Sequence, residues 1–148
     1  MDRRTASKLL VVLPACLTST RRAEPVAPAE PPPPTPPTRP APNAFDAGPR
    51  TDYAPGTATR FRNKRVIVIH DELGVMAVSA VCTHQACLVK VAERSLACAC
   101  HGSEFTMDGE VLVGPAKEPL PHFAVTTYEG RIHVDPSRRV PKSERLIL

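Results

Sequence analysis

The 148-residue chain has no tryptophan, four phenylalanines and two tyrosines, so aromatic side chains are scarce. Proteins that bind single-stranded nucleic acid stack bases on aromatic side chains beside a positively charged groove. The formal net charge of the whole chain is +4, but many of the basic residues lie near the N-terminus, and the two signs nearly balance from residue 56 onward. The sequence therefore disfavours a nucleic-acid partner.

The sequence also lacks a long apolar run near its N-terminus, where only Leu9–Leu17 is apolar. That run is about half of the ~20 residues that a transmembrane helix needs. It follows a basic start and precedes small residues, which is the three-part pattern of an export signal over residues 1–16. The sequence Leu-Pro-Ala-Cys is similar to a lipobox, in which the cysteine becomes the lipidated first residue of the mature protein. We therefore expect export, with Cys16 as the lipidation site; a cleaved signal without lipid is the alternative.

Proline is abundant, with 18 residues, and it is concentrated between Glu24 and Pro42. This stretch consists mostly of Pro, Ala and Thr and has almost no large side chain to bury, so it cannot offset the entropy of becoming ordered. We expect it to be extended, near the polyproline II conformation. Residues 17–55 are interpreted as a disordered, semi-rigid tether, and residues 56–148 as the folded domain.

The folded part shows β-strand patterns, and no segment longer than about ten residues has helical periodicity. Apolar, β-branched runs on either side of Asp-Glu-Leu-Gly at residues 71–74 predict a hairpin. Similar runs predict a second hairpin turning near residues 93–95 and a third turning at residues 129–130. We therefore predict an all-β fold, a small antiparallel β-sandwich or barrel with functional residues in loops at the strand ends.

Four of the five cysteines and two of the five histidines lie in two short clusters. The first cluster has the pattern Cys-x-His-x-x-Cys and the second Cys-x-Cys-His; their members are Cys82, His84 and Cys87, then Cys98, Cys100 and His101. A tetrahedral metal takes four ligands. If each cluster supplies one cysteine and one histidine, one cysteine is left over on each, and these two could pair as a disulfide.

Two thiolates and two imidazoles can hold either a zinc ion or an iron–sulfur cluster. Zinc fingers with these ligands usually space their histidines on a helix. Here each histidine lies within three residues of a cysteine, in a loop between predicted strands. A structural zinc-binding β module without a redox role is the alternative interpretation.

The two clusters closely resemble those of the Rieske family. The matching segments are "CTHQAC" and "CACHGS", followed by "FTMDGEVLVGPAKEPLP", and the resemblance covers about residues 66–135. In that family two cysteines bind one iron of a [2Fe–2S] cluster and two histidines bind the other. The resemblance implies a Rieske domain with this cofactor and one-electron transfer as its function. No nucleophile or flavin motif accompanies it, so we do not expect the domain to be a catalyst on its own.

The resemblance also implies a role for each member of the two clusters. The cysteine ligands would be Cys82 and Cys98, on the inner iron. The histidine ligands would be His84 and His101, on the outer iron near the surface.

The two cysteines that remain, Cys87 and Cys100, would form a disulfide between the loops. Family members that have this disulfide occur in quinol-oxidising cytochrome complexes and among other exported proteins, and a disulfide suits an oxidising compartment. The implied partners are a quinol-oxidising cytochrome, a c-type cytochrome or a molybdenum oxidoreductase subunit. The implied location is the periplasmic side of the membrane.

Five further positions match or depart from the family pattern. Ser103 matches a serine that donates to a bridging sulfide, and Gly114 and Pro115 match a proline loop that covers the cluster. Phe105 stands where high-potential members have a tyrosine that donates to a ligand sulfur, so we expect a lower potential. Ala86 stands where glycine is usual, and we expect the first turn to differ slightly because alanine tolerates a positive φ poorly.

Overall fold

The computed structural model describes residues 39–148. The expectations for the export signal, for Cys16 and for most of the proline-rich tether concern residues 1–38, outside this range. Within residues 39–148 all strand pairs are antiparallel, and the only helices are two short 3-10 turns, η1 (Arg50–Asp52) and η2 (Arg62–Lys64). The prediction of an all-β fold is confirmed. No helix in this range is long and apolar enough to cross a bilayer.

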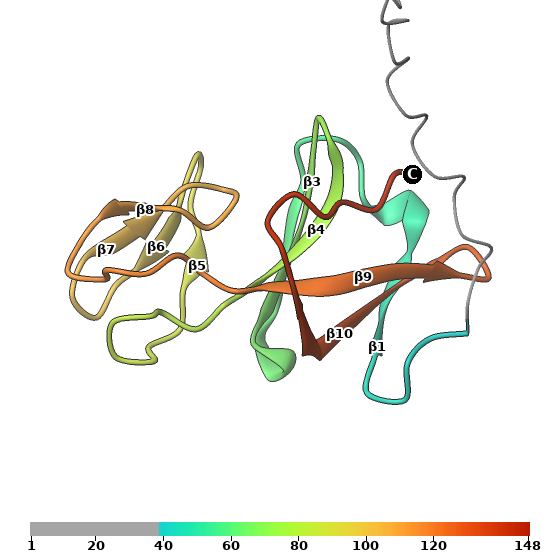
Figure 1. Cartoon of the computed structure of the whole chain (residues 1–148). Helices are drawn as coiled ribbons and strands as arrows, with labels where there is room; N and C mark the ends of the chain where they lie inside the picture. The colour runs from blue at the N-terminus through green and yellow to red at the C-terminus, as the bar shows by residue number, and fades with distance from the viewer. Residues whose placement is uncertain (1–38) are drawn as a thin grey trace, which may run out of the picture. The chain divides into compact units, whose positions relative to one another are not determined.

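Six strands form the larger sheet, in the order β1-β10-β9-β4-β3-β2 (Figure 1). Their bounds are β1 Phe45–Pro49, β2 Ala58–Phe61, β3 Val66–Asp71, β4 Gly74–Ser79, β9 His122–Tyr128 and β10 Arg131–Val140. The two edge strands approach each other, since the rings of Phe45 on β1 and Phe61 on β2 lie 5.3 Å apart. The sheet therefore curls into a nearly closed barrel.

Four short strands form the second antiparallel sheet: β5 Lys90–Val91, β6 Leu96–Cys98, β7 Ser103–Phe105 and β8 Val111–Val113, in sequence order. All four lie between β4 and β9 in the sequence, so residues 80–121 are an insertion into the barrel. The insertion begins and ends on neighbouring strands, because Val78 of β4 pairs with His122 of β9. We call residues 80–121 the small subdomain.

The hairpin β3–β4 forms the centre of both cores, as its continuous apolar runs indicate. Alternate residues of the two strands belong to different buried clusters. One set packs with the small subdomain and consists of Ile67, Ile69, Met76 and Val78. The other set packs with β1 and β10 and consists of Val66, Val68, Val75 and Ala77. The hairpin thus joins the barrel to the subdomain that carries both Cys/His clusters.

The folded domain begins earlier than residue 56, where the sequence analysis placed its start. Strand β1 lies in the range that we assigned to the tether, and its Phe45 pairs with Val134 of β10. Tyr53 is also buried, and its hydroxyl donates to the carbonyl of Ala47 at 2.6 Å. The segment Phe-Asp-Ala-Gly-Pro has no clear alternation, so its pairing with a distant strand determines its conformation.

The segment after β10 packs back onto the β3–β4 hairpin. Val75 and Leu146 exchange two backbone hydrogen bonds, each 2.8 Å long. Gly74 makes this approach possible: its φ is +129°, and a Cβ at this position would lie 2.6 Å from the carbonyl oxygen of Leu146. A side chain at position 74 would therefore displace the C-terminal segment.

Two basic residues of the same segment connect it to both sheets. Arg145 pairs with Asp71 of β3 at 3.2 Å, and the Arg145 side chain is only 8% exposed. Lys142 pairs with Asp108 at 2.8 Å and with Glu110 at 2.9 Å, both in the small subdomain. The exposed pairs of Lys142 contribute up to ~1 kcal/mol each. They hold the small subdomain against the barrel in addition to the shared core.

His122 is a buried histidine at this junction. Its Nε2–H donates to the carbonyl of Asp108 at 2.9 Å, which leaves Nδ1 buried without a hydrogen-bond partner within residues 39–148. Burial lowers the pKa of His122 below its usual value of 6.5, and the positive charges of Arg145 and Lys142 lower it further. The hydrogen bond to Asp108 opposes this shift. The folded protein therefore favours the neutral imidazole.

We expect the free energy of unfolding to decrease as the pH falls below the usual histidine pKa of about 6.5. The reason is that His122 of the unfolded chain gains a proton that the folded protein disfavours; above this pH the contribution of His122 is complete. Urea unfolding at about pH 7.5 and about pH 5 would measure the loss. The loss should be smaller for His122→Gln than for the wild type, and equal losses would contradict the assignment.

Candidate metal centre

The first Cys/His cluster lies on the loop between β4 and β5. The N–H of Cys82 donates to the carbonyl of Cys87 at 2.8 Å, and the N–H of Ala86 donates to the carbonyl of Cys82 at 3.0 Å. These bonds close the loop on itself. His84 lies within it and is half-buried, and its Nδ1 is buried with no hydrogen-bond partner in the part of the chain that the structure describes. This nitrogen is available to bind a metal.

The second cluster lies on the turn between β6 and β7. Cys98 ends β6 and pairs with Ser103, which begins β7. The N–H of Gly102 donates to the carbonyl of Cys98 at 3.1 Å, which makes the connection short and places Cys100 and His101 at its tip. His101 is exposed.

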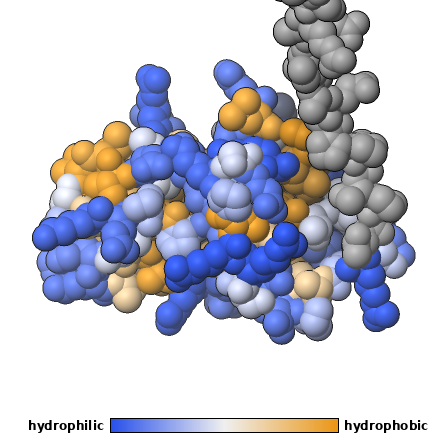
Figure 2. All heavy atoms as spheres, viewed as in Figure 1, coloured by the Kyte–Doolittle hydropathy of each residue, from blue (hydrophilic) through white to orange (hydrophobic). Residues whose placement is uncertain are grey.

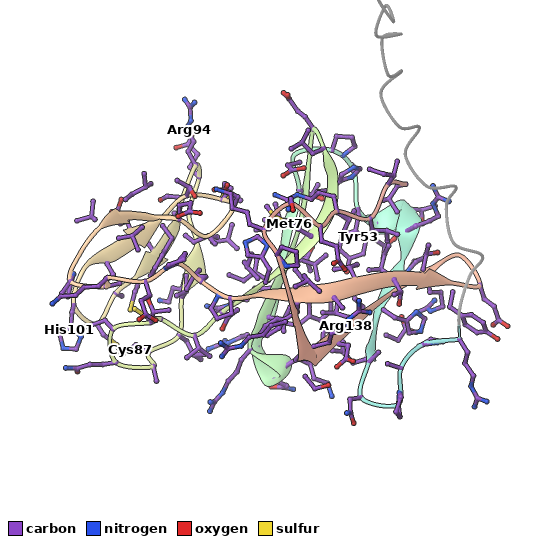
Figure 3. All side chains as sticks on the ribbon, in the orientation of Figure 1. Tyr53, Met76, Cys87, Arg94, His101 and Arg138 are labelled. Carbon is purple, nitrogen blue, oxygen red and sulfur yellow. A yellow bond between two sulfur atoms is a disulfide. The ribbon has the colours of Figure 1, made fainter. Side chains whose placement is uncertain are left out.

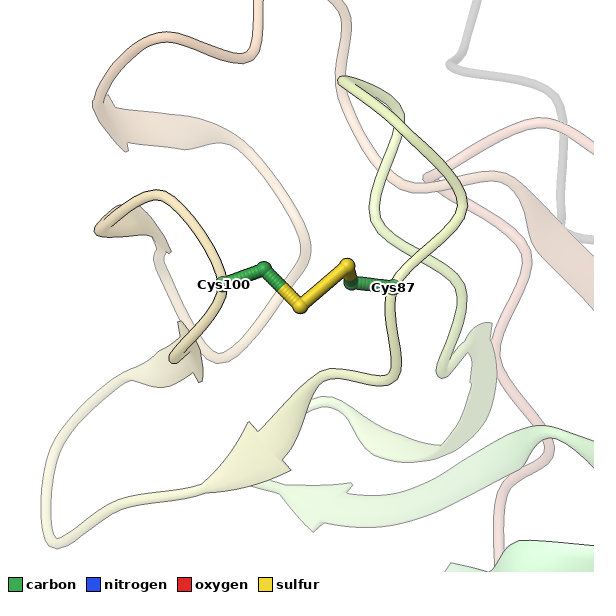
Figure 4. The surroundings of a disulfide bond; sticks show 2 residues. All are labelled: Cys87 and Cys100. Atoms are coloured by element: carbon green, nitrogen blue, oxygen red, sulfur yellow. A yellow bond between two sulfur atoms is a disulfide. The ribbon is translucent and has the colours of Figure 1, made fainter.

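A disulfide between Cys87 and Cys100 joins the two loops (Figure 4). This pairing, which the family resemblance implied, is confirmed. The rings of His84 and His101 lie edge to face with their centroids 4.9 Å apart. The two imidazoles that were predicted to share one iron therefore come together from different loops.

Two cysteines are left as thiols within residues 39–148, Cys82 and Cys98, and each is only 2% exposed. The sulfur of Cys98 lies within 4.8 Å of both disulfide sulfurs. The disulfide sulfurs of Cys87 and Cys100 are not thiolates, so these three cysteines do not form a metal site of their own. Burying a thiolate is costly unless a metal compensates its charge. The buried thiols and the two facing imidazoles form the donor set that a [2Fe–2S] cluster of the Cys2His2 type requires.

The segment around Gly114 and Pro115 is hydrogen-bonded to both loops. Ser103 is fully buried, and its Oγ accepts the N–H of Ala116 at 3.0 Å. On the other side, Thr83 donates its hydroxyl to the carbonyl of Glu118 at 2.6 Å. The hydroxyl hydrogen of Ser103 is still available for a second acceptor. Sequence reasoning singled out Ser103 but missed Thr83, whose only signal is its position between two predicted ligands.

Phe105 lies in the middle of the core behind the site. It is fully buried on β7, where it pairs with Leu96. Phe105 belongs to the same buried cluster as the thiols of Cys82 and Cys98. Position 105, where the resemblance places a tyrosine that donates to a ligand sulfur, therefore lies in the same core as the two thiols.

The three remaining histidines lie outside the site, as the strand pattern around them suggested. Nδ1 of His70 lies 2.7 Å from the carbonyl of Tyr53, and Nδ1 of His133 lies 3.3 Å from that of Arg131. His122 is bonded to the β7–β8 turn as described above.

The fold and this site together define a small antiparallel β domain of the iron–sulfur type, in which each of two loops contributes one buried cysteine thiol and one histidine. Residues 44–128, more than half of the chain, match the family model of the Rieske [2Fe-2S] domain. The chain belongs to this family, and its cofactor is a [2Fe–2S] cluster.

Curated relatives include the cytochrome b6-f complex iron-sulfur subunit of Chlorobaculum tepidum, which is 38% identical over 96 residues, 62% of this chain and 53% of that protein. The chloroplastic subunit of Pisum sativum is 34% identical over 90 residues, 54% of this chain and 39% of that protein. The chain thus spans about half, or less, of the length of these relatives.

One solved structure with the same fold is the complex of reduced oxygenase and oxidized ferredoxin in carbazole 1,9a-dioxygenase. The matched chain is 21% identical, with a TM-score of 0.50 over 67% of this chain and 97% of that chain.

Ala86 has a φ of +55°, so the first loop contains a left-handed turn with alanine in it. An L-residue in this conformation costs roughly 1–2 kcal/mol, whereas glycine adopts it readily. We expect Ala86→Gly to raise the free energy of unfolding by about 0.5–1 kcal/mol, since the relief of strain exceeds the added freedom of the unfolded chain.

Thermal or urea unfolding of the full chain would measure this change. Ala92→Gly provides the control because Ala92 is exposed and has no positive φ. That substitution should lower the stability. A decrease for both variants would show that the turn at Ala86 is not strained.

Proposed function

We propose that this protein transfers single electrons by means of a [2Fe–2S] cluster bound by Cys82, Cys98, His84 and His101. The observation that supports this most strongly is that each loop contributes one buried thiol and one imidazole, and that the imidazoles lie 4.9 Å apart. When bound, such a cluster supplies a one-electron couple, and its two neutral imidazoles make reduction easier than in all-cysteine ferredoxins.

The residues around the site divide it into a closed and an open side. Cys82 and Cys98 lie in the core with Phe105 and Leu120, which keeps water away from the thiolates. His101 is exposed at the tip of its turn. Electrons would therefore enter and leave through the imidazole side, where a partner can approach closely.

The zinc-binding alternative has less support. A structural zinc site would need only four ligands and no accompanying disulfide, whereas Cys87 and Cys100 pair beside the donor set. The match to the Rieske family also favours iron.

The proposal extends to the location and the partners of the protein. The disulfide Cys87–Cys100 supports an oxidising compartment, the periplasmic side of a membrane. Residues 1–16 would direct export, Cys16 would carry a lipid anchor, and the proline-rich tether would give the domain its reach. The names of the curated relatives, iron-sulfur subunits of the cytochrome b6-f complex, support a cytochrome complex as partner, and the partner that we propose is a quinol-oxidising one. A c-type cytochrome and a molybdenum oxidoreductase subunit are the other partner classes.

We expect the purified wild type to show visible absorption and a reduced-state EPR signal of a [2Fe–2S] cluster. Cys82→Ala and His101→Ala should lose both, because removal of one ligand exposes an iron to water. Cys16→Ala is the matched control, a cysteine outside the site, and should keep both signals. A colourless wild type that contains zinc would contradict the proposal, and an unaltered EPR signal in either ligand variant would contradict the ligand assignment.

Phe105→Tyr should raise the reduction potential. The reduced cluster carries more negative charge on its sulfurs, so a tyrosine hydroxyl that donates to a cysteine sulfur stabilises the reduced state. A net gain of ~1–1.5 kcal/mol corresponds to roughly 40–70 mV for one electron. Protein-film voltammetry would measure the shift. A lower potential, or an unchanged one with the cluster intact, would show that residue 105 does not face a ligand sulfur.

A further inference from the structure

One end of the barrel carries a group of basic residues that form no ion pair within residues 39–148. They come from η2 with the residue after it and from the end of β10, and they are Arg62, Lys64, Arg65, Arg138 and Arg139. All five are exposed. The ion pairs found within residues 39–148 involve other basic residues, Arg131, Lys142 and Arg145. We call these five residues the basic barrel end.

The register of the large sheet brings the two segments together. Val66 at the start of β3 pairs with Ser79 at the end of β4, and the N–H of Ala80 donates to the carbonyl of Arg65 at 2.8 Å. On the other side of β9, Arg139 pairs with Phe123. Arg65 and Arg139 are thus three strand spacings apart across the sheet, roughly 14 Å at ~4.8 Å per spacing, and three residues apart along the strands, roughly 10 Å. A single protein surface could cover both.

Most of the nearby carboxylates are already engaged; the exception is the exposed Glu118, which lines the same pocket as Arg139. Asp46 lies 2.6 Å from Arg131. Asp135 is buried and accepts hydrogen bonds from the N–H and the hydroxyl of Ser137, which shapes the irregular part of β10 that carries Arg138. Residues 62–65 and 136–139 themselves contain no Asp or Glu. Within residues 39–148, the five positive charges of this surface therefore outnumber the free carboxylates found beside it, of which Glu118 is one.

The basic barrel end adjoins the first cluster loop. The small subdomain is inserted at this end of the barrel, between the end of β4 and the start of β9. Arg60 of β2 donates to the carbonyl of Val89 at 2.9 Å, two residues beyond Cys87. Arg139 lines the same pocket as Thr83, the neighbour of the ligand His84.

Figure 3 labels one residue of the basic barrel end, Arg138, which lies to the right of Cys87 and His101 in the view. In Figure 3 His101 and Arg138 lie toward the lower side of the view, whereas Arg94 extends from the upper side. Figure 2 shows hydrophilic residues along that lower side.

We propose that the basic barrel end docks an acidic electron-transfer protein beside the first cluster loop. This inference rests on the proposed electron-transfer function and specifies the charge of the partner. Uncompensated cations next to a redox site attract an acidic partner and raise its rate of association. The chain's own residues 1–38 do not supply the complementary charge, since their basic residues outnumber their acidic ones.

The inference predicts that the basic barrel end attracts anions. Oxidation of the reduced full-length holoprotein by two small oxidants of opposite charge tests this attraction. In each reaction one electron leaves the reduced cluster, and it reduces either ferricyanide to ferrocyanide or tris(phenanthroline)cobalt(III) to cobalt(II). The patch variant is R138E/R139E. The control R50E/R94E has the same net charge, but Arg94 lies on the β5–β6 turn, and Arg50 lies at the opposite barrel end, where its N–H donates to Gly130.

At low ionic strength, stopped-flow measurements should show a roughly tenfold slower oxidation of the patch variant by ferricyanide, and a faster oxidation by the cobalt complex. The control should stay within about twofold of the wild type, and salt should remove the difference. Polyglutamate, a protein-like polyanion, should slow ferricyanide oxidation of the wild type and of the control but not of the patch variant.

Equal rates of ferricyanide oxidation in both double variants, or equal inhibition of both by polyglutamate, would overturn the inference. The proposed function would remain intact as long as the EPR signal is normal. Binding to phosphatidylglycerol vesicles is a further test, measured by sedimentation. If the wild type sediments with the vesicles, the patch variant does not, and polyglutamate has no effect, the surface binds lipid headgroups and the inference is overturned. A wild type without the reduced-state EPR signal would overturn the proposed function, and this inference with it.

Discussion

The disulfide between Cys87 and Cys100 joins two loops that are otherwise closed by their own backbone hydrogen bonds. Each loop carries one of the two buried thiols and one of the two facing imidazoles, so the donor set exists only while the loops keep their relative positions. The contacts of Thr83 and Ser103 with residues 116–118 provide a second connection, but each is a single hydrogen bond. Loss of a disulfide in a small domain typically costs ~2–5 kcal/mol, more than two such bonds contribute. Among the direct links between the two loops, this covalent bond is the strongest, and the core shared by Cys82 and Cys98 supports it.

Local patterns were enough to predict the hairpins, because apolar β-branched runs and their turn residues lie next to each other in the sequence. The prediction was wrong for β1, whose segment Phe-Asp-Ala-Gly-Pro follows the proline-rich stretch and pairs with residues more than eighty positions away. The ligand set and the disulfide were assigned from the spacing of the clusters and the family resemblance. Spacing alone leaves open which cysteine of each cluster pairs, because the pairing depends on how the two loops face each other.

Two properties of the site could not be derived from the sequence. Ala86 keeps a left-handed φ although alanine disfavours it, since the closed hydrogen bonding of its loop outweighs the local preference. The near balance of charge from residue 56 onward also concealed the basic barrel end. Counting charges along the chain averages over surfaces, whereas the register of the sheet places Arg65 and Arg139 at one end of the barrel.

The small subdomain leaves and rejoins the barrel on the adjacent strands β4 and β9, where Val78 pairs with His122. An insertion whose two ends lie one strand spacing apart leaves the strand pairing of its host complete, although the two parts share the core around Ile67 and Met76. In evolutionary terms, the two parts can diverge at different rates. Changes in loop length or in the tip residues of the subdomain alter its redox chemistry without changing strand pairing in the barrel. Conversely, substitutions on the barrel surface can change the protein's affinity for other molecules without moving the cluster-binding loops. The architecture thus separates the tuning of a potential from the choice of a partner.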